Sequence, residues 1–426
     1  MPPSGHHHAL PPGTERATLL MLGAVQFTHI LDFMIMMPLG AQLMRVFNIT
    51  PSQFTQLVAC YGLAAAVSGF VGGFFMDRFD RKRALLVLYA GFGISTFACG
   101  LAPTHHWLMV ARLAAGAFGG LAGSMVTAMI GDIIPPERRG RAMAVVMGAF
   151  PVASVLGVPV GLVLAGKYGW HAPFFMLGAC AGANLLFGSL VLPHLRTAVA
   201  DHNPRRQMRE ILSHRLHLRA FALGGVLVMG GGVLIPFIAP SFVANVGLNE
   251  TFQLPLVYVA GGLATMISMP LVGWLSDRVD RLWLFTWLSA AAIVVVLVIV
   301  RLGPSSFGFA ALMMALFMVP MSGRFAPAMT MVTNAVESRY RGGFMSVNSA
   351  LQQATSGLAN VLAGFFVTRD PAGHLLGYPV LGYVSVAFFV LAVLCAIGLR
   401  NAAPHVATPA KKDVPPPPHV EVEAFT

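Results

Sequence analysis

The residues best suited to move a proton form one polar stripe in an otherwise apolar stretch. Gln26, His29 and Asp32 follow one another at intervals of three within residues 17–39. On a helix they share one face, over an arc of about 120°. Of 16 acidic residues and 14 histidines, only Asp32 and His29 lie deep in such a stretch. We predict a proton-coupling role for both; the alternative is that they pair with each other and only brace the helix.

Two arginines, Arg112 and Arg324, also lie inside apolar stretches. Arg112 comes about five residues into its stretch, where a guanidinium could simply bond helix backbone near the outer surface. Arg324 lies deeper and could attract an anionic substrate. Because its own half has no carboxylate within a stretch, Asp32 and backbone carbonyls are its candidate partners.

A second polar stripe is predicted to bind substrate. Its residues are spaced four apart, so they share one helix face about 120° wide: Asn348, Gln352, Ser356 and Asn360. We expect this face to line an aqueous cavity, together with Gln26 and Phe33 of the first stretch. The alternative is a set of interhelical hydrogen bonds, each worth about 0.6 kcal/mol.

One charged pattern occurs twice, at a constant offset of 200 residues. It comprises Gly73, Asp77, Arg78, Asp80 and Arg81, which return as Gly273, Asp277, Arg278, Asp280 and Arg281. Each copy ends an apolar stretch and starts a short polar break, which predicts two related halves. The acid and base of each hairpin could pair with the ends of neighbouring helices. The alternative is that these charges only anchor the chain at a membrane surface.

Composition indicates what positions these residues. Hydrophobic residues make up 56% and charged residues 10%, whereas soluble domains carry about 25% charged residues. A membrane span needs about 20 apolar residues, and a lipid-exposed backbone must be helical unless it closes a barrel. We therefore predict an all-α membrane protein with twelve transmembrane helices in two six-helix halves. Their ranges are 17–39, 54–76, 83–102, 107–131, 142–166, 172–192, 219–243, 254–276, 282–303, 306–331, 344–367 and 379–399.

The basic residues predict the orientation. Twenty-one of the 27 Lys and Arg residues fall on the side of the two tails, four fall on the other side, and two lie inside spans. Both termini are thus predicted to be cytoplasmic, and the net charge of +11 reflects topology and not nucleic-acid binding. The expected order is an N-tail (1–16), a first half (17–192), a linker (193–218) with a surface helix near 206–218, a second half (219–399) and a disordered C-tail (400–426).

The hairpin after the second span resembles the commonest signature of the major facilitator superfamily, G-x-L-a-D-R-x-G-R-R/K. Here it runs from Gly73 to Arg83, with Asp80 where the family usually has Gly. The resemblance covers nearly the whole chain and implies two six-helix halves and alternating access. It also implies that the hairpins latch the cytoplasmic side shut. Arg112-x-x-x-Gly116 is similar to a second family motif, which implies a coupling role for Arg112.

The fifth span resembles the antiporter motif of the twelve-span drug:proton exporters. Gly148, Gly157, Pro159 and Gly161 carry the likeness, with Gly-x-Pro-x-Gly in place of the usual Gly-Pro-x-x-Gly. The following Gly169-Trp170 is similar to the arabinose and sugar efflux branch. The resemblance implies a proton-coupled exporter of a drug-like amphiphile or sugar, monomeric, in a bacterial cytoplasmic membrane. A glycine face that includes Ala165 predicts a close helix contact.

No enzyme or energy-transducing motif is recognisable. The single Gly-Lys pair, Gly166-Lys167, is followed by Tyr168, so no phosphate-binding loop is predicted. No catalytic residue, metal site or cofactor is expected, and all four cysteines fall within spans. Two further functions stay open at this point: a passive facilitator or importer of the same fold, and a non-transporting membrane sensor.

Overall fold

The computed structural model describes residues 11–72, 79–193, 204–337 and 340–408, and these are almost entirely helical. A single two-residue antiparallel pairing, β1 (Thr368–Arg369) with β2 (Leu375–Leu376), interrupts the helices among the described residues. The first helices along the chain are α1 (Pro12–Ile35), α2 (Gly40–Val46), α3 (Pro51–Gly72), α4 (Arg81–Gly100), α5 (His105–Ile133), α6 (Pro136–Met147), α7 (Ala149–Val152), a π-helical turn (Ala153–Gly157), α8 (Val158–Tyr168) and α9 (Ala172–Val191). The later ones are α10 (Pro204–Ser213), α11 (Arg215–Gly232), α12 (Ile235–Ala244), α13 (Gln253–Ser276), α14 (Arg281–Ile299), α15 (Phe307–Gly323), α16 (Phe325–Asn334), α17 (Arg341–Phe366), α18 (Tyr378–Ala402) and a 3-10 turn (Pro404–Val406).

Eleven helical segments of the described residues are long and apolar enough to cross a membrane. Three of them combine helices that meet at a bend: α6 to α8, α11 with α12, and α15 with α16. The remaining long helix, α17, has 26 residues. It carries the amide stripe, which lowers its mean hydropathy. The all-helical membrane fold is confirmed, and α17 is consistent with a twelfth span.

The repeated hairpins end in matching helix caps. Asp80 accepts a hydrogen bond from the Arg83 N–H at 2.8 Å, and Asp280 accepts one from the Trp283 N–H at 2.9 Å. An acidic N-cap stabilises a helix start by about 1 kcal/mol. The signature described above has glycine at the position of Asp80. The caps give a physical reason for the difference, because the Asp80 side chain caps the start of α4 as Asp280 caps the start of α14.

The fifth span bends before its proline. A π-helical turn over Ala153–Gly157 precedes α8, and Pro159 lies in the first turn of α8. Proline lacks an N–H and its ring collides with the carbonyl four residues earlier, so the wider π turn accommodates it. The helix is therefore irregular just before Pro159, in a π turn that ends at Gly157.

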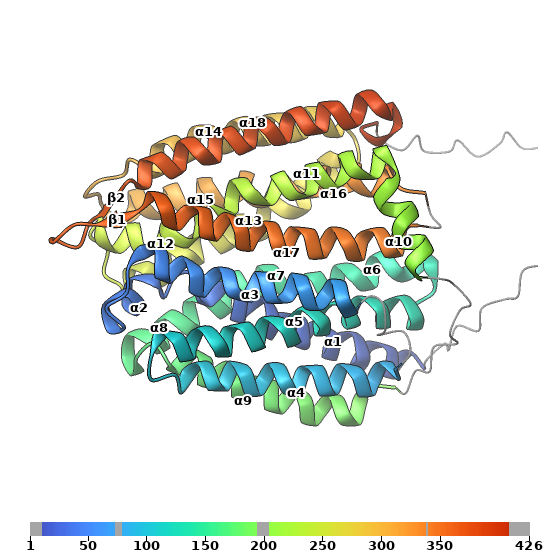
Figure 1. Ribbon diagram of the computed structural model, residues 1–426, viewed down its shortest axis with the longest axis horizontal. Helices are drawn as coiled ribbons and strands as arrows, with labels where there is room; N and C mark the ends of the chain where they lie inside the picture. The colour runs from blue at the N-terminus through green and yellow to red at the C-terminus, as the bar shows by residue number, and fades with distance from the viewer. Residues whose placement is uncertain (1–10, 73–78, 194–203, 338–339, 409–426) are drawn as a thin grey trace, which may run out of the picture.

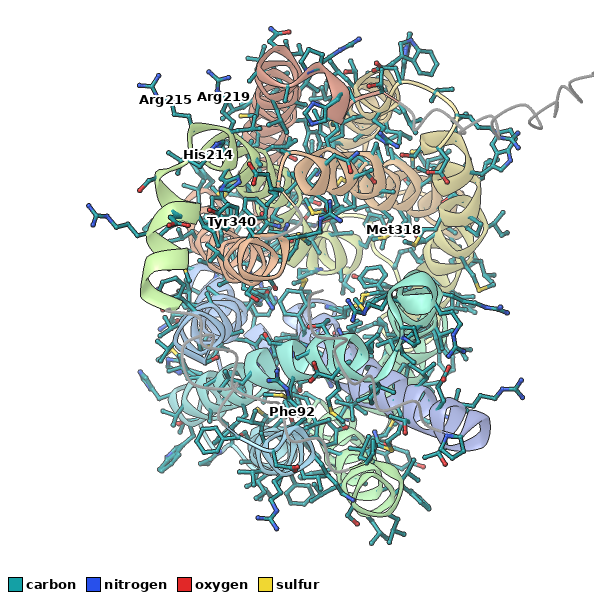
Figure 2. All side chains as sticks on the ribbon, turned by 90° about the vertical axis from the view of Figure 1, so that its right-hand side faces the viewer. Phe92, His214, Arg215, Arg219, Met318 and Tyr340 are labelled. Atoms are coloured by element: carbon teal, nitrogen blue, oxygen red, sulfur yellow. The ribbon has the colours of Figure 1, made fainter. Side chains whose placement is uncertain are left out.

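The helices form two sets that lie side by side. Figure 1 shows the N-terminal set (α1–α9, blue to green) below the C-terminal set (α11–α18, green to red), with α3 and α17 adjacent where the sets meet. We name the side on which α1 begins and α18 ends the tail side, at the right of Figure 1. The opposite side, with α2, α12 and the β1–β2 hairpin, is the loop side. Figure 2 views the tail side and again shows the two sets one above the other.

The apolar core joins the two sets on the loop side only. One buried cluster combines N-terminal residues such as Leu39 and Phe54 with C-terminal residues such as Phe237 and Phe242. On the tail side, each set has a separate cluster of its own. An Arg45–Glu250 ion pair adds a second link between the sets on the loop side. The structure is therefore closed at the loop side.

Two predicted boundaries were wrong, for identifiable reasons. The linker helix α10 ends at Ser213, and α11 begins at Arg215 inside the predicted linker, because a helix near a membrane surface tolerates basic residues in its first turns. The predicted C-tail from 400 is ordered as far as residue 408. Val406 and Ala407 are fully buried against the C-terminal set, so their apolar side chains hold the segment in place.

Candidate functional site

The centre of the N-terminal set holds a fully buried ion pair. Arg112 Nη1 donates to Asp32 Oδ2 at 2.7 Å, and both side chains are 0% exposed. The same Nη1 lies 3.3 Å from the Asp32 carbonyl oxygen. The guanidinium also stacks over Tyr61, with its carbon 4.3 Å from the ring centroid. A buried pair of this kind is costly to keep and more costly to break.

Close packing of α3 against α5 brings Arg112 to this position. A Cβ added at Gly116 would lie 2.2 Å from the Tyr61 carbonyl oxygen, and one at Gly120 would lie 2.7 Å from Ala65 Cα. Only glycine permits this approach. Arg112 lies one turn before Gly116, so the contact that seats the helix also places the guanidinium beside α1. The sequence motif therefore has a direct steric reason.

The ion pair leaves polar atoms without partners. Asp32 Oδ1 and Arg112 Nε and Nη2 make no hydrogen bond with any described residue. The same holds for both ring nitrogens of His29 and for Gln26 Oε1, which lie on the same face of α1. Buried polar atoms without partners are rare and require an explanation. These four side chains therefore have hydrogen-bonding atoms that are free to take new partners.

The alternative that His29 and Asp32 pair with each other does not hold in this structure. The His29 ring packs 6.0 Å from the Tyr61 ring and 5.9 Å from the Phe92 ring, measured between centroids. Gly119 provides the space, because a Cβ there would lie 2.8 Å from His29 Cδ2. The partner of Asp32 is Arg112, 80 residues away in the chain. Arg112 contacts both the Asp32 carboxylate and a backbone carbonyl, so the alternative in which it bonds only helix backbone does not describe it.

Arg324 occupies a different environment from Arg112. Its side chain is fully buried between α11 and α18, where Nη2 donates to the Leu227 carbonyl oxygen at 3.2 Å. The guanidinium carbon lies 3.9 Å from the centroid of the Phe389 ring. Nε and Nη1 have no hydrogen-bond partner among the described residues. Of the two candidate partners, the structure brings a backbone carbonyl to Arg324 and does not bring Asp32.

The polar stripe of α17 contacts α16 at one end and has unpartnered atoms at the other. Asn348 and Gln352 point to α16, where Gln352 Nε2 lies 3.3 Å from Met329 Sδ and Asn348 Nδ2 lies 4.0 Å from it. Ser356 is half-buried. Asn360 is buried, and both its amide atoms lack partners in the described part of the chain. The stripe thus offers unused donors and acceptors at the helix that joins the two sets.

The adjacent face of α17, about 100° round the helix from the stripe, is the one that packs on α3. A Cβ at Gly62 would lie 3.1 Å from the Gln353 carbonyl oxygen, and a Cβ at Gly357 would lie 3.1 Å from the Ala59 carbonyl oxygen. Phe33 on α1 packs against α3, with its ring centroid 5.8 Å from that of Tyr61. Small residues therefore form the seam between the sets near the buried ion pair.

The glycine face of the fifth span contacts α1 as expected. A Cβ at Gly157 would lie 2.8 Å from Leu31 Cδ2, and one at Gly161 would lie 2.6 Å from Ile35 Cδ1. Gly148 ends α6 at the first bend. On its other side the π turn meets α13, since a Cβ at Gly262 would lie 2.9 Å from a Val155 methyl. The fifth span therefore lies between the helix that carries Asp32 and α13.

The two charged hairpins have different partners on the tail side. Gly73, Asp77 and Arg78 lie outside the described residues. Arg81 Nε lies 3.0 Å from Asp132 Oδ2 at the end of α5. In the second copy, Arg281 bonds the Ala407 and Thr408 carbonyl oxygens through its N–H and guanidinium.

The other members of the second hairpin are mostly exposed. Arg278 stacks over Trp274, with its guanidinium carbon 3.9 Å from the ring centroid, and Asp280 pairs with Arg400 at 3.1 Å. Gly273 has open space where a Cβ would be. Asp277 is exposed and forms no ion pair with a described residue. Within the described ranges, no group of three or more His, Cys, Asp or Glu side chains could hold a metal ion.

Comparison with known proteins decides the family. The family model described as Major Facilitator Superfamily matches residues 22–359. The chain belongs to this superfamily. It is therefore a multi-pass membrane transporter, and its relatives are transporters and not enzymes.

Individual relatives of this superfamily member are distant. The chain is 26% identical to the uncharacterized MFS-type transporter YceJ of Bacillus subtilis over 369 residues, which are 85% of this chain and 92% of that protein. It is 34% identical to the vacuolar membrane amino acid uptake transporter fnx2 of Schizosaccharomyces pombe over 146 residues, 34% of this chain and 25% of that protein. The crystal structure of a bacterial homolog of the human lysosomal transporter Spinster, inward-facing and occupied, matches with a TM-score of 0.75. That match has 17% identity and covers 94% of this chain and 100% of the other, which establishes the shared fold.

Proposed function

We propose that this transporter exports a small molecule from the bacterial cytoplasm in exchange for protons. The observation that carries the proposal is the fully buried Asp32–Arg112 pair with its unpartnered polar neighbours. Ionisable groups at membrane depth are expensive, and those that persist commonly serve ion or substrate pathways. Transporter folds built from two repeats place such sites near the bilayer midplane.

The sidedness of the proposal rests on the basic residues. The sequence assigns 21 of the 27 Lys and Arg residues to the side of the two tails, which favours the cytoplasm for that side. The structure, closed at the loop side, then corresponds to a state that faces the cytoplasm. Export requires the reverse state, in which the shared loop-side core opens and the tail-side clusters come together. The charged hairpins lie where such closure would occur, and the latch is part of this proposal.

Within this proposal, Asp32 alternates between pairing with Arg112 and holding a proton. When Asp32 takes up a proton, Arg112 loses its ionic partner. Arg112 already has two donors without partners in the described residues, Nε and Nη2, so it could then bind a substrate oxygen. His29 lies on the same helix face with both ring nitrogens unused, and we assign it a relay role.

The proposed substrate site lies between α1, α5 and α17. Gln26 and Phe33 on α1 would face the amides of α17. There, among the described residues, Asn360 has an unused donor and acceptor, and the Gln352 amide donates only to Met329 Sδ. This mixture suits a small amphiphile or a sugar. Arg324 is the weaker candidate, because its contacts are those of a guanidinium that braces α11 against α18. The fnx2 match favours an uptake transporter as the second candidate function.

A transport assay in inverted membrane vesicles with an imposed proton gradient tests the proposal. A panel of sugars, amphiphilic cations and amino-acid derivatives would identify a substrate. Asp32→Asn keeps the side-chain shape and removes the proton site, so gradient-driven transport should be lost while counterflow persists. The matched control is Asp370→Asn, which makes the same change at an acid in the loop-side hairpin region.

The possible outcomes separate the functions. Gradient-driven accumulation in inverted vesicles that Asp32→Asn abolishes supports proton-coupled export. Movement that follows the substrate gradient alone, in both variants, would instead indicate a facilitator. Accumulation only in right-side-out vesicles would indicate uptake, and full pH-driven transport by Asp32→Asn would overturn the role of Asp32.

A further inference from the structure

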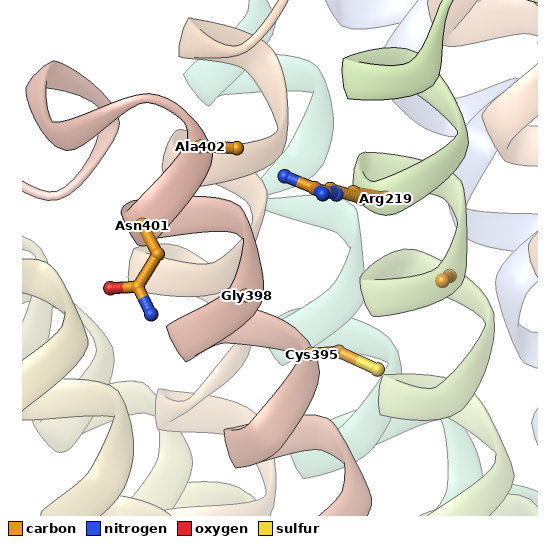
Figure 3. A pocket seen from close by; sticks show the side chains of 6 residues that line it. Arg219, Cys395, Gly398, Asn401 and Ala402 are labelled. Atoms are coloured by element: carbon orange, nitrogen blue, oxygen red, sulfur yellow. The ribbon is translucent and has the colours of Figure 1, made fainter.

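A cavity outside the transport site lies between α11 and α18 at their tail-side ends. Its volume is about 490 Å³, and its lining residues come from these two helices only: Arg219, Ala222, Cys395, Gly398, Asn401 and Ala402. Figure 3 shows Arg219 extending from α11 toward Ala402, and Cys395 pointing from α18 toward α11. Neither helix carries a residue of the Asp32 site, so the cavity is separate from it.

Small side chains explain why this space is hollow. The wall below Arg219 consists of Ala222, Cys395 and Gly398. A Cβ added at Gly398 would meet no atom within 4 Å, so the groove is open at that point. The next turns of α18 expose Leu394 (57%) and Ile397 (38%). Exposed leucine and isoleucine on a membrane-spanning helix face lipid, so the groove continues from the lipid-facing surface.

The mouth of the groove is positively charged. Arg219 and Arg215 are exposed and one helical turn apart, and Figure 2 shows both at the same edge of the tail side. Neither forms an ion pair with a described residue, and no acid lines the cavity. Asp280, the N-cap of α14, is already paired with Arg400 of α18. Arg219 therefore has its guanidinium donors available at the depth where a span meets water.

From this arrangement we infer that the α11–α18 groove binds an anionic phospholipid. The phosphate would pair with Arg219 at the mouth, and an acyl chain would lie along Ala222, Cys395 and Gly398. Basic pockets between membrane helices on the cytoplasmic side recognise anionic headgroups in this way. A free phosphate would leave the apolar wall unused, and an uncharged lipid would leave Arg219 without a counter-charge. The combination of a cation above an apolar groove therefore favours a lipid over either.

Native mass spectrometry of the detergent-purified full chain tests this inference. The protein is titrated with phosphatidylglycerol, phosphatidylcholine and, separately, inorganic phosphate. We expect the phosphatidylglycerol adduct to be retained about fivefold more strongly than the phosphatidylcholine adduct. This ratio corresponds to the attraction between one arginine near the membrane surface and an anionic headgroup. Arg219→Gln should abolish that preference. The control is Arg141→Gln, which removes an exposed tail-side charge that does not line this cavity.

A second variant tests the groove independently of the charge. Gly398→Leu would fill open space without a clash, so the protein should fold while the acyl chain is excluded and lipid retention falls. Equal retention of the two lipids by the unmodified protein would overturn the inference. So would unchanged retention in both Arg219→Gln and Gly398→Leu. Displacement of phosphatidylglycerol by equimolar inorganic phosphate would show a phosphate site and not a lipid site.

Discussion

The buried ion pair provides the sharpest test of how this transporter is held together. Arg112→Met removes the cation and leaves the Asp32 carboxylate fully buried; Asp32→Asn does the reverse. Loss of one partner of a buried pair typically destabilises a protein by about 3–5 kcal/mol. The double variant removes both charges at once and should cost clearly less than the sum of the two. We expect a coupling energy of about 1–3 kcal/mol.

A matched pair elsewhere in the chain calibrates the magnitude. Arg138 and Glu15 form two hydrogen bonds of 3.1 Å at the tail side, but Arg138 is 59% exposed. Exposed pairs contribute about 0–1 kcal/mol, so Arg138→Met should fall in that range. The free energy of unfolding in mixed detergent micelles measures all variants on one scale.

The result that would refute the reasoning is additivity. If the costs of Arg112→Met and Asp32→Asn add within about 0.5 kcal/mol, the two side chains are not energetically coupled. A cost for Arg112→Met no larger than that for Arg138→Met would mean that the site is hydrated, and the argument from burial would fail.

Two further predictions concern contacts away from the charges. Gly157→Leu should give folded protein with poor or proton-leaky transport, because a Cβ there would already lie 2.8 Å from Leu31 Cδ2. The control is Gly182→Leu, because a Cβ at Gly182 would meet no atom within 4 Å. Normal, leak-free transport by Gly157→Leu would contradict this prediction. Arg281→Ala removes the guanidinium hydrogen bond to the Thr408 carbonyl oxygen, worth about 1.5–3 kcal/mol for a charged donor, and keeps the backbone bond to Ala407. Limited proteolysis should then cut the C-terminal segment faster, and an unchanged rate would show that apolar burial alone retains it.

The repeated hairpins show how much a sequence repeat can predict. The acidic caps at Asp80 and Asp280 are equivalent in both copies because a cap is a local interaction within three residues. The partners of Arg81 and Arg281 differ, a carboxylate in one copy and backbone carbonyls in the other. These partners come from α5 and from the segment after α18, which the repeat does not duplicate. Equivalent residues in the two copies therefore need not have equivalent mechanical roles.

The errors at the boundaries have a common origin. The start of α11 and the order of residues 403–408 both depend on burial against other helices, at Ala220 and at Val406. Polarity along the chain suggested a linker and a disordered tail. Tertiary packing overrode that local preference, because a few buried apolar side chains outweigh the entropy of a short segment.

Composition and spacing by themselves determined that this is a helical membrane protein, and that Asp32, His29 and Gln26 share a helix face. These features are local, since helix periodicity and the length of an apolar span act within one segment. Only the tertiary structure decided that Asp32 pairs with Arg112 and not with His29, and that Arg324 lies against Phe389. The partner of a buried charge is set by which helices pack together. Here the glycines of α5 that admit α3 place Arg112 beside Asp32, which is 80 residues away along the chain.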